Sequence, residues 1–192
     1  MTILERLFGS PARVRLMRLF YLNPDKPLAM KEISKMAKLS RRAISKENKL
    51  LSSIGFLKKG GKRGFAISET FPLFSVLRNL VITASPASRE NLLNFFKKHK
   101  KIKLVSIGGV FLDSASGESK LDLLIVGNGI KKSAVEKFVK KMEPDIGKEI
   151  NWSFLSLAEF NDRVAMHDKF LRDFFDSPNE CLVNKISAEE RA

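Results

Sequence analysis

The stretch Met30–Gly55, MKEISKMAKLSRRAISKENKLLSSIG, reads as two helices joined by a very short turn. In the first helix, Ile33, Met36 and Ala37 lie on one face at helical spacing. Ser40 can cap the second helix, because its hydroxyl can accept a hydrogen bond from a free backbone N–H of the first turn. The rest of the chain is interpreted outward from this pair of helices.

The second helix is predicted to have two contrasting faces. At about 100° per residue, its apolar half holds Ala43, Ile44, Leu50, Leu51 and Ile54. The opposite half holds cations and hydroxyls, namely Arg41, Arg42, Ser45, Lys46, Lys49, Ser52 and Ser53. Arginine and lysine can bond guanine edges or phosphates, and small residues let a helix enter the major groove. A basic face that is only solvated is the alternative for this helix taken alone.

Asn48 lies at the edge of the predicted apolar stripe. A buried amide there needs a hydrogen-bonding partner to avoid an energetic cost. The side chain could instead turn toward a DNA groove and read adenine.

A β-hairpin is predicted directly after the helix pair. The runs Phe56–Lys58 and Phe65–Ile67 flank a basic turn, Lys59-Gly60-Gly61-Lys62-Arg63-Gly64. Helix, short turn, helix and cationic hairpin, in this order, resemble the winged helix-turn-helix of ArsR-like transcriptional regulators. The resemblance implies a recognition helix in the major groove of double-stranded DNA, with the wing along the phosphates. It points to Ser40, Arg41, Arg42, Ser45, Lys46, Lys49, Lys58, Lys59, Lys62 and Arg63 as DNA-binding residues.

Flanking segments are predicted to complete this domain. A helix is expected from Ser10-Pro11, a serine cap followed by proline at the first helical position, and Pro27–Met30 is expected to be a short strand. A very apolar helix from Phe71 to about Val81 either forms an interface or packs across the domain. The best linker is residues 84–88, which gives domains at 1–85 and 86–192.

The two predicted domains differ sharply in charge. The chain carries a net charge of +14. Residues 1–85 hold 17 lysines and arginines against 5 acidic residues, whereas residues 86–192 hold 18 against 16. Almost all the excess positive charge therefore lies in the first domain, as expected of a nucleic-acid-binding domain joined to a nearly neutral partner.

Composition excludes several classes of protein. No apolar run is long enough to cross a bilayer, and Glu5 and Arg6 interrupt any signal-peptide core. One cysteine, Cys181, and two histidines, His99 and His167, exclude a disulfide framework and a zinc cluster. We expect a cytoplasmic protein without a structural metal.

The second domain is predicted to be a small α/β domain with a mixed sheet, which makes the whole chain α+β. Nearly continuous apolar runs at 102–107 and 121–126 predict buried strands. Further strands are expected at 149–155 and 181–183, and helices at 89–98, 131–146, 157–164 and 169–175. The basic run 97–103 either contacts phosphates or is a solvated helix end.

A second resemblance concerns Ile107-Gly108-Gly109, followed after ten intervening residues by Lys120-Leu121-Asp122. Small nucleotidyltransferases of the DNA polymerase β superfamily are similar: they carry a hydrophobic residue, Gly, then Gly or Ser, and later a strand with two acids flanking a hydrophobic residue. In that family the glycines approach a triphosphate and the acids hold two magnesium ions. Here Lys120 replaces the first acid, and only Asp122 remains. The resemblance therefore implies a domain that has lost catalysis, with Gly108, Gly109, Lys120 and Asp122 in a vestigial nucleotide cleft and no cofactor.

The two resemblances together predict a DNA-binding transcriptional regulator, acting as a homodimer on half-sites about one helical turn apart. The second domain would serve dimerisation or bind an effector. Two alternatives remain: a magnesium-dependent nucleotidyltransferase, and an antitoxin-like protein-interaction module.

Overall fold

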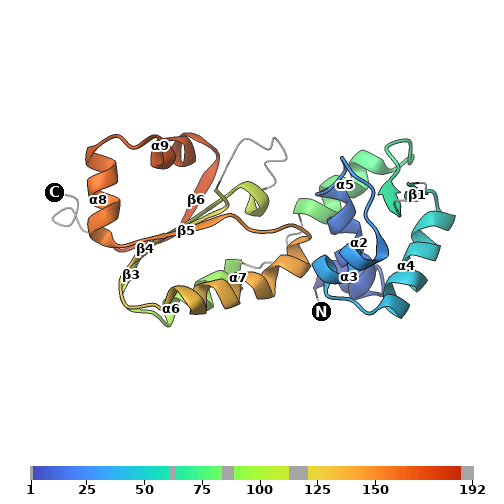
Figure 1. Ribbon diagram of the computed structural model, residues 1–192, viewed down its shortest axis with the longest axis horizontal. Helices are drawn as coiled ribbons and strands as arrows, with labels where there is room; N and C mark the ends of the chain where they lie inside the picture. Colours follow the sequence, from blue (N-terminus) through green and yellow to red (C-terminus); the bar gives the residue numbers. More distant parts are fainter. Residues whose placement is uncertain (1, 61–63, 84–88, 113–120, 187–192) are drawn as a thin grey trace. The chain divides into compact units, whose positions relative to one another are not determined.

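The computed structural model describes residues 2–60, 64–83, 89–112 and 121–186. Over these ranges the chain is mixed α+β, with a two-stranded sheet and a four-stranded mixed sheet (Figure 1). The α+β class predicted from the sequence is therefore confirmed. The chain forms two compact units, of which unit 1 contains Met1–Pro86 and Met142–Glu149, and unit 2 contains Ala87–Lys141 and Ile150–Ala192.

Unit 1 begins with helices, continues with a hairpin and returns to a helix. Ser10 caps the second helix by accepting a hydrogen bond from Arg13 N (3.2 Å), and Pro11 is the first helical residue, as predicted. The elements are α1 (Ile3–Leu7), α2 (Pro11–Tyr21), α3 (Met30–Ala37), α4 (Arg41–Ser53), β1 (Leu57–Lys59), β2 (Phe65–Ile67) and α5 (Phe74–Thr83).

The turn between α3 and α4 is short because one residue takes a left-handed conformation. Lys38 has φ 50°, which reverses the chain directly after α3. The hydroxyl of Ser34 donates to the carbonyl of Leu39 (2.8 Å) and holds the turn. Ser40 then accepts from Ala43 N (3.2 Å), so the predicted cap of α4 is confirmed.

The hairpin pairs β1 with β2 in antiparallel register, Lys58 lying opposite Ala66. The strand predicted at 27–30 is reduced to a single bridge, in which Leu28 exchanges two hydrogen bonds with Phe65 (2.7 and 3.0 Å). The chain starts α3 at Met30, so no longer strand can form there. Gly64 passes so close to Leu28 that any side chain at this position would overlap its carbonyl group.

The core of unit 1 forms around α2. Leu16, Leu19 and Phe20 are fully buried in it. Arg18 is buried as well, and its guanidinium donates to the carbonyls of Val81 (2.9 Å) and Asp145 (3.4 Å). Burial lowers the pKa of Arg18 to about 10, while the carboxylates of Asp145 and Glu5 oppose this shift. The charge is thus accommodated by carbonyl oxygens at the ends of two elements.

Unit 2 contains the four-stranded sheet, in the order β5-β4-β3-β6. Strands β4 and β5 are parallel, and the other neighbours are antiparallel, so the predicted mixed sheet is confirmed. The elements are α6 (Arg89–Lys97), β3 (Ile102–Gly108), η2 (Gly109–Phe111), β4 (Leu123–Gly127), α7 (Lys132–Ile146), β5 (Trp152–Leu155), α8 (Leu157–Ala165), α9 (Lys169–Asp176) and β6 (Asn179–Asn184). The last residues of α7, from Met142 on, belong to unit 1.

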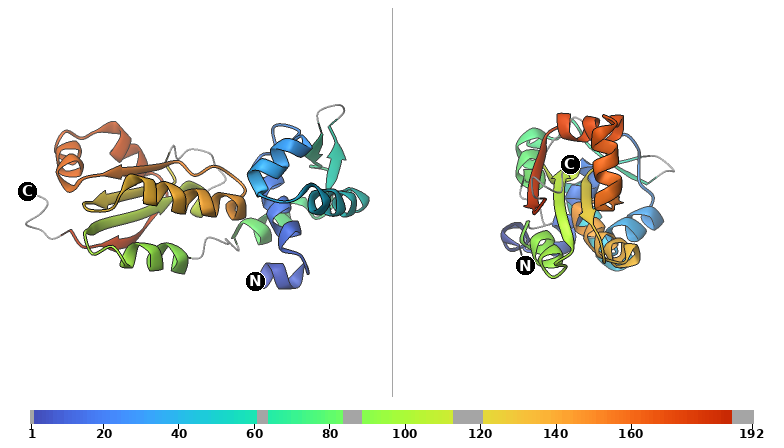
Figure 2. Two further views of the ribbon diagram at one scale, coloured as in Figure 1. Left: turned by 60° about the horizontal axis from the view of Figure 1, so that its bottom comes forward. Right: turned by 90° about the vertical axis from the view of Figure 1, so that its left-hand side faces the viewer.

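Helices cover both faces of this sheet. Figure 2 shows α6 and α7 lying side by side along one face, with α8 and α9 away from them. The rings of Phe95 and Phe138 stack with their centroids 3.8 Å apart and join α6 to α7. On the other face, Leu124 and Val126 share a buried cluster with Phe174 of α9. Successive residues of β4 thus alternate between two layers of core, which explains the continuous apolar run of the sequence.

Candidate nucleic-acid interface

The exposed face of α4 is a continuous stripe of cations and hydroxyls. All five predicted positions on the helix are exposed, and at about 100° per residue they span an arc of about 140°. Ser40, which caps the helix, is exposed at the same end. Among the described residues no ion pair is formed by the four cations of the stripe. The stripe consists of Arg41, Arg42, Ser45, Lys46 and Lys49.

The buried face of α4 is rotated relative to the sequence prediction. Ile44 and Leu51 are buried as expected, but Leu50 is 38% exposed and Ile54 is 52% exposed. Polar residues Glu47 and Asn48 take the buried positions instead. The predicted apolar face of α4 was therefore wrong: the buried face is rotated from it by roughly 50° about the helix axis. The prediction of the buried face used the hydrophobic pattern alone. That pattern cannot show that a carboxylate has bonding partners and can therefore be buried.

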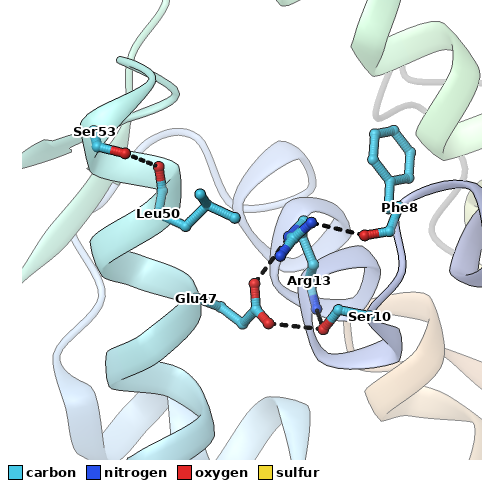
Figure 3. A network of polar contacts seen from close by, with 6 residues as sticks. All are labelled: Phe8, Ser10, Arg13, Glu47, Leu50 and Ser53. Atoms are coloured by element: carbon cyan, nitrogen blue, oxygen red, sulfur yellow. Dashed lines mark hydrogen bonds and ion pairs between the residues drawn. The ribbon is translucent and has the colours of Figure 1, made fainter.

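That partner is supplied by the start of α2 (Figure 3). The carboxylate of Glu47 accepts hydrogen bonds from Ser10 Oγ (2.8 Å) and from Arg13 Nε (2.9 Å). Arg13 also donates through Nη1 to the carbonyl of Phe8 (2.7 Å), next to the end of α1. Both oxygens of the buried carboxylate are thereby bonded. The network fixes the rotation of α4 about its own axis, and so fixes which residues form the exposed stripe.

Asn48 is buried, and neither its amide nitrogen nor its amide oxygen has a hydrogen-bonding partner among the described residues. The same holds for Ser52 Oγ, one turn further along α4. Ser52 was predicted to lie on the polar face, so its buried hydroxyl is a second correction. The expectation that Asn48 could point into a groove is also wrong, since its side chain faces the interior. Unpaired buried polar groups cost stability, and nothing else in the structure explains these two.

The hairpin places two further predicted residues at the surface beside α4. Lys58 and Lys59 are exposed on β1. Directly before β1, Phe56 N donates a hydrogen bond to the carbonyl of Leu51 (2.9 Å) and holds the start of the strand against α4. Gly60 N donates to the carbonyl of Gly64 (2.7 Å) across the base of the turn. Lys62 and Arg63 lie outside the described residues. The stripe and the two lysines thus lie on two consecutive elements of unit 1, α4 and β1.

The predicted vestigial cleft lies in unit 2, and three of its four residues come together there. The carboxylate of Asp122 is buried and accepts from Val110 N (2.9 Å) and from Asn151 N (2.8 Å). Gly108 N donates to the carbonyl of Asp122 (2.9 Å), and Gly109, at φ 46°, passes so close that a side chain would overlap the carboxylate. Lys120 lies outside the described residues.

This geometry gives Asp122 a structural task. Each of its two carboxylate oxygens is engaged by a backbone N–H, one at the start of η2 and one just before β5. Over residues 2–60, 64–83, 89–112 and 121–186, no group of three or more His, Cys, Asp or Glu side chains is arranged to hold a metal ion. Asp122 therefore clamps three chain segments together around the glycine pair.

A cavity of about 260 Å³ in unit 2 was not anticipated from the sequence. Leu121, Phe170 and Phe174 supply its apolar lining, and Lys169 and Asp173 its charged groups. Phe174 also lies against Gly108, where an added Cβ would come within 3.2 Å of its ring. The α9 residues that form the cavity gave no signal in the sequence beyond an amphipathic helix.

Comparisons with protein-family models, with curated proteins and with solved structures found no match for this chain. No helix in the described part of the chain is long and apolar enough to span a membrane. Functional inference therefore rests on the residues and geometry above.

Proposed function

We propose that the protein is a DNA-binding transcriptional regulator whose winged helix-turn-helix is formed by α2 to β2. The observation that carries this proposal is the exposed stripe of α4, in which four cations and a small hydroxyl occupy one arc of a helix. A helix of this kind can enter the major groove, where Arg and Lys bond base edges and phosphates. The exposed Lys58 and Lys59 would contact phosphates beside the groove, and Lys62 and Arg63 are proposed for the same task.

The buried Glu47 supports this function over a merely solvated basic face. A solvated face has no need of a fixed rotation, whereas a recognition helix must present particular side chains to the groove. Glu47 is bonded by two side chains from the start of α2 and sets that rotation. The single acid on α4 is thus used internally, which leaves its outer face without negative charge.

A homodimer is proposed because α5 has an unpartnered apolar stripe. Leu73, Val76 and Leu80 are 58%, 70% and 43% exposed, the last two lying on α5 and Leu73 directly before it. Burying this stripe against a second copy would remove it from water. Dimerisation would also match a regulator that grips two half-sites about one helical turn apart. Val76→Glu should convert a dimer to a monomer in sedimentation analysis, and an unchanged dimer would exclude α5 as the interface.

The unit 2 domain is proposed to be a nucleotidyltransferase-like domain without catalysis, which serves dimerisation or binds an effector. The support is that both oxygens of Asp122 are taken by backbone amides. A carboxylate used in this way is poorly placed to hold two divalent cations. Magnesium-dependent incorporation of labelled nucleotide, abolished by Asp122→Ala in folded protein, would instead establish the enzyme.

The testing experiment is selection of genomic duplex fragments at several salt concentrations, followed by sequencing of the bound fraction. Enrichment of one inverted repeat at physiological salt is expected of a sequence-specific regulator. Arg42→Ala should weaken binding to the enriched site and relax its sequence preference, whereas Lys58→Ala should weaken all sequences alike. Arg6→Ala, which removes an exposed cation from α1, is the matched control. Uniform binding to every fragment, with equal effects of all three variants, would overturn the proposal.

A further inference from the structure

Unit 2 carries a second cluster of cations, separate from α4. Six lysines occupy two segments that join helices to strands, one between α6 and β3 and the other between β4 and α7. All six are exposed. We call this cluster the lysine edge, and it consists of Lys97, Lys98, Lys100, Lys101, Lys131 and Lys132.

Sheet topology brings the two segments to the same end of unit 2. Ile102 begins β3 and lies opposite Gly127, the last residue of β4, because the two strands are antiparallel. Asn128 N donates to the carbonyl of Lys101 (3.1 Å), and the stem of Lys101 lies against Gly129 so closely that a side chain there would have to displace it. The two lysine segments are therefore in direct contact.

Strand β6 brings a further lysine to the same end. Asn184 lies opposite Leu104, and Lys185 N donates to the carbonyl of Lys103 (2.7 Å). Lys185 is exposed. Residues 97–103, 127–132 and 184–186 contain no Asp or Glu. The small net charge of residues 86–192 is an average, since these three segments are strongly positive.

Two acids on helices of unit 2 form hydrogen bonds with partners outside the lysine edge. Glu136, one turn after Lys132, is hydrogen-bonded by Lys140 (2.5 Å), and this bond lowers the pKa of Glu136. The carboxylate of Glu159 caps α8 by accepting from Ser156 N (2.8 Å). In the part of the chain that the structure describes, no lysine of the edge forms an ion pair.

We propose that the lysine edge is a second contact surface for the phosphate backbone of duplex DNA. Lysine is a compact charge on a flexible stem, suited to phosphates and not to planar base recognition. A membrane surface would need large apolar side chains among the cations, and none of the strongly exposed large hydrophobic residues lies in these segments. A protein partner is disfavoured because lysine is depleted from protein interfaces.

This inference extends the proposed function by adding affinity without sequence reading. Two cationic surfaces on one chain can bind one polymer, so that occupation of one raises the effective concentration at the other. The exposed stripe of α4 would select the site, and the lysine edge would increase the number of phosphates neutralised. The slope of the logarithm of the binding constant against the logarithm of the salt concentration then reports how many phosphate contacts each surface makes.

The test compares two triple variants of the full chain that lose equal charge. The first, Lys100→Gln/Lys101→Gln/Lys131→Gln, removes half of the lysine edge. The control, Lys137→Gln/Lys141→Gln/Lys169→Gln, removes three exposed lysines of unit 2 from α7 and α9. At about 1.5 Å per residue, Lys141 lies about 14 Å along the axis of α7 from Lys132, its first residue. Binding of each variant to a random-sequence DNA duplex is measured at a series of salt concentrations.

We expect the first variant to lower the magnitude of the log–log salt slope by about 2.7, at about 0.9 for each lost phosphate contact, and the control to leave it nearly unchanged. Equal changes in both variants would overturn the inference, because they would reflect net charge alone. An unchanged DNA slope with lost binding to phosphatidylserine vesicles would overturn it in favour of a membrane.

A further pair of measurements separates this inference from the proposed function. The same triple variants are made in an Arg42→Ala/Lys46→Ala background. If this α4 pair leaves DNA binding unchanged while the lysine-edge variant still loses slope, the proposed use of α4 fails and the lysine edge stands. If the α4 pair weakens binding and the lysine-edge variant matches its control, the lysine edge fails alone.

Discussion

Glu47 is an acidic residue in the middle of a basic helix, and it is buried between two helices. Its carboxylate accepts from Ser10 and Arg13, so removing it would leave Arg13 without its ion-pair partner. Breaking a buried pair on one side costs about 3–5 kcal/mol, and partial exposure of Arg13 reduces this to roughly 2 kcal/mol. We expect Glu47→Ala to lower the free energy of unfolding by that amount in urea titration.

The exposed Glu69 provides the matched control for that experiment. Glu69→Ala removes the same charge from unit 1 and should change stability by less than about 0.5 kcal/mol. Equal losses in the two variants would show that charge, and not the bonded carboxylate, determines the effect.

Tyr21 gives a prediction for alkaline pH, and it can be measured directly because it is the only tyrosine in the chain. Burial raises the pKa of Tyr21 from 10.0 to about 12, and its hydroxyl donates to the carbonyl of Phe74 (3.0 Å). The folded state favours the neutral phenol, so this stability is full below pH 10 and is lost as pH rises through 12. The pKa shift corresponds to about 2–3 kcal/mol.

Arg18 changes the free energy of unfolding in the opposite direction to Tyr21 over a similar range of pH. Its lowered pKa means that the folded state disfavours the charged form, and this cost is relieved as pH rises above about 10. Comparison of wild type with Tyr21→Phe isolates the tyrosine, and the variant should lose less stability between pH 10 and 12. Tyrosinate absorbance of the folded wild type should titrate near pH 12, and a midpoint near 10 would contradict the burial.

At the scale of elements, the sequence predicted well which helices and strands form. It predicted less well how one helix, α4, is rotated about its axis. Ser40, the short turn and the hairpin glycines are local signals, and the structure confirms the elements they indicated. The rotation of α4 depends on Ser10 and Arg13, more than 30 positions away in the chain. Helical periodicity cannot register such a partner, so Leu50 and Ile54 were predicted on the buried face, although both are exposed.

Asp122 likewise has bonding partners that the sequence pattern does not reveal. The sequence grouped Asp122 with Gly108 and Gly109, and the structure brings these three residues together. It did not reveal that both oxygens are bonded by backbone N–H groups from two other elements. The residue that would be catalytic by analogy is thus used to join η2, β4 and the approach to β5.

We therefore expect Asp122→Asn to destabilise unit 2. An amide offers one acceptor oxygen, so either Val110 N or Asn151 N would face an NH₂ group in place of an oxygen. Hydrogen bonds to a charged group contribute about 1.5–3 kcal/mol each, and we expect a loss of roughly 2 kcal/mol, read from Trp152 fluorescence during urea unfolding. Asp176→Asn on the exposed side of α9 is the control. Unchanged stability in Asp122→Asn would show that the clamp is dispensable.

At the scale of the whole molecule, charge is divided very unequally along the chain. Residues 1–85 carry 17 basic and 5 acidic residues, and residues 86–192 carry 18 and 16. This division was predicted from the sequence, because it needs no tertiary information. The structure adds that unit 1 also contains Met142–Glu149, whose Asp145 forms an ion pair with Arg15. A segment remote in sequence thus supplies a carboxylate to the basic unit.

The charge division predicts that salt stabilises the two units differently. Like charges in unit 1 repel one another and oppose its compact state, and salt screens that repulsion. The chain has one tyrosine, in unit 1, and one tryptophan, Trp152, in unit 2, so each unit has its own spectroscopic reporter. On raising NaCl from about 0.05 to 0.5 M, where screening lengths fall from over 10 Å to a few ångströms, the Tyr21 near-ultraviolet transition should move to higher temperature. The Trp152 fluorescence transition should move much less, because unit 2 carries a net charge of +4, from 17 basic and 13 acidic residues, whereas unit 1 carries +10, from 18 and 8. Equal shifts of both transitions in NaCl would mean that the salt acts on the whole chain and not through the charge of unit 1.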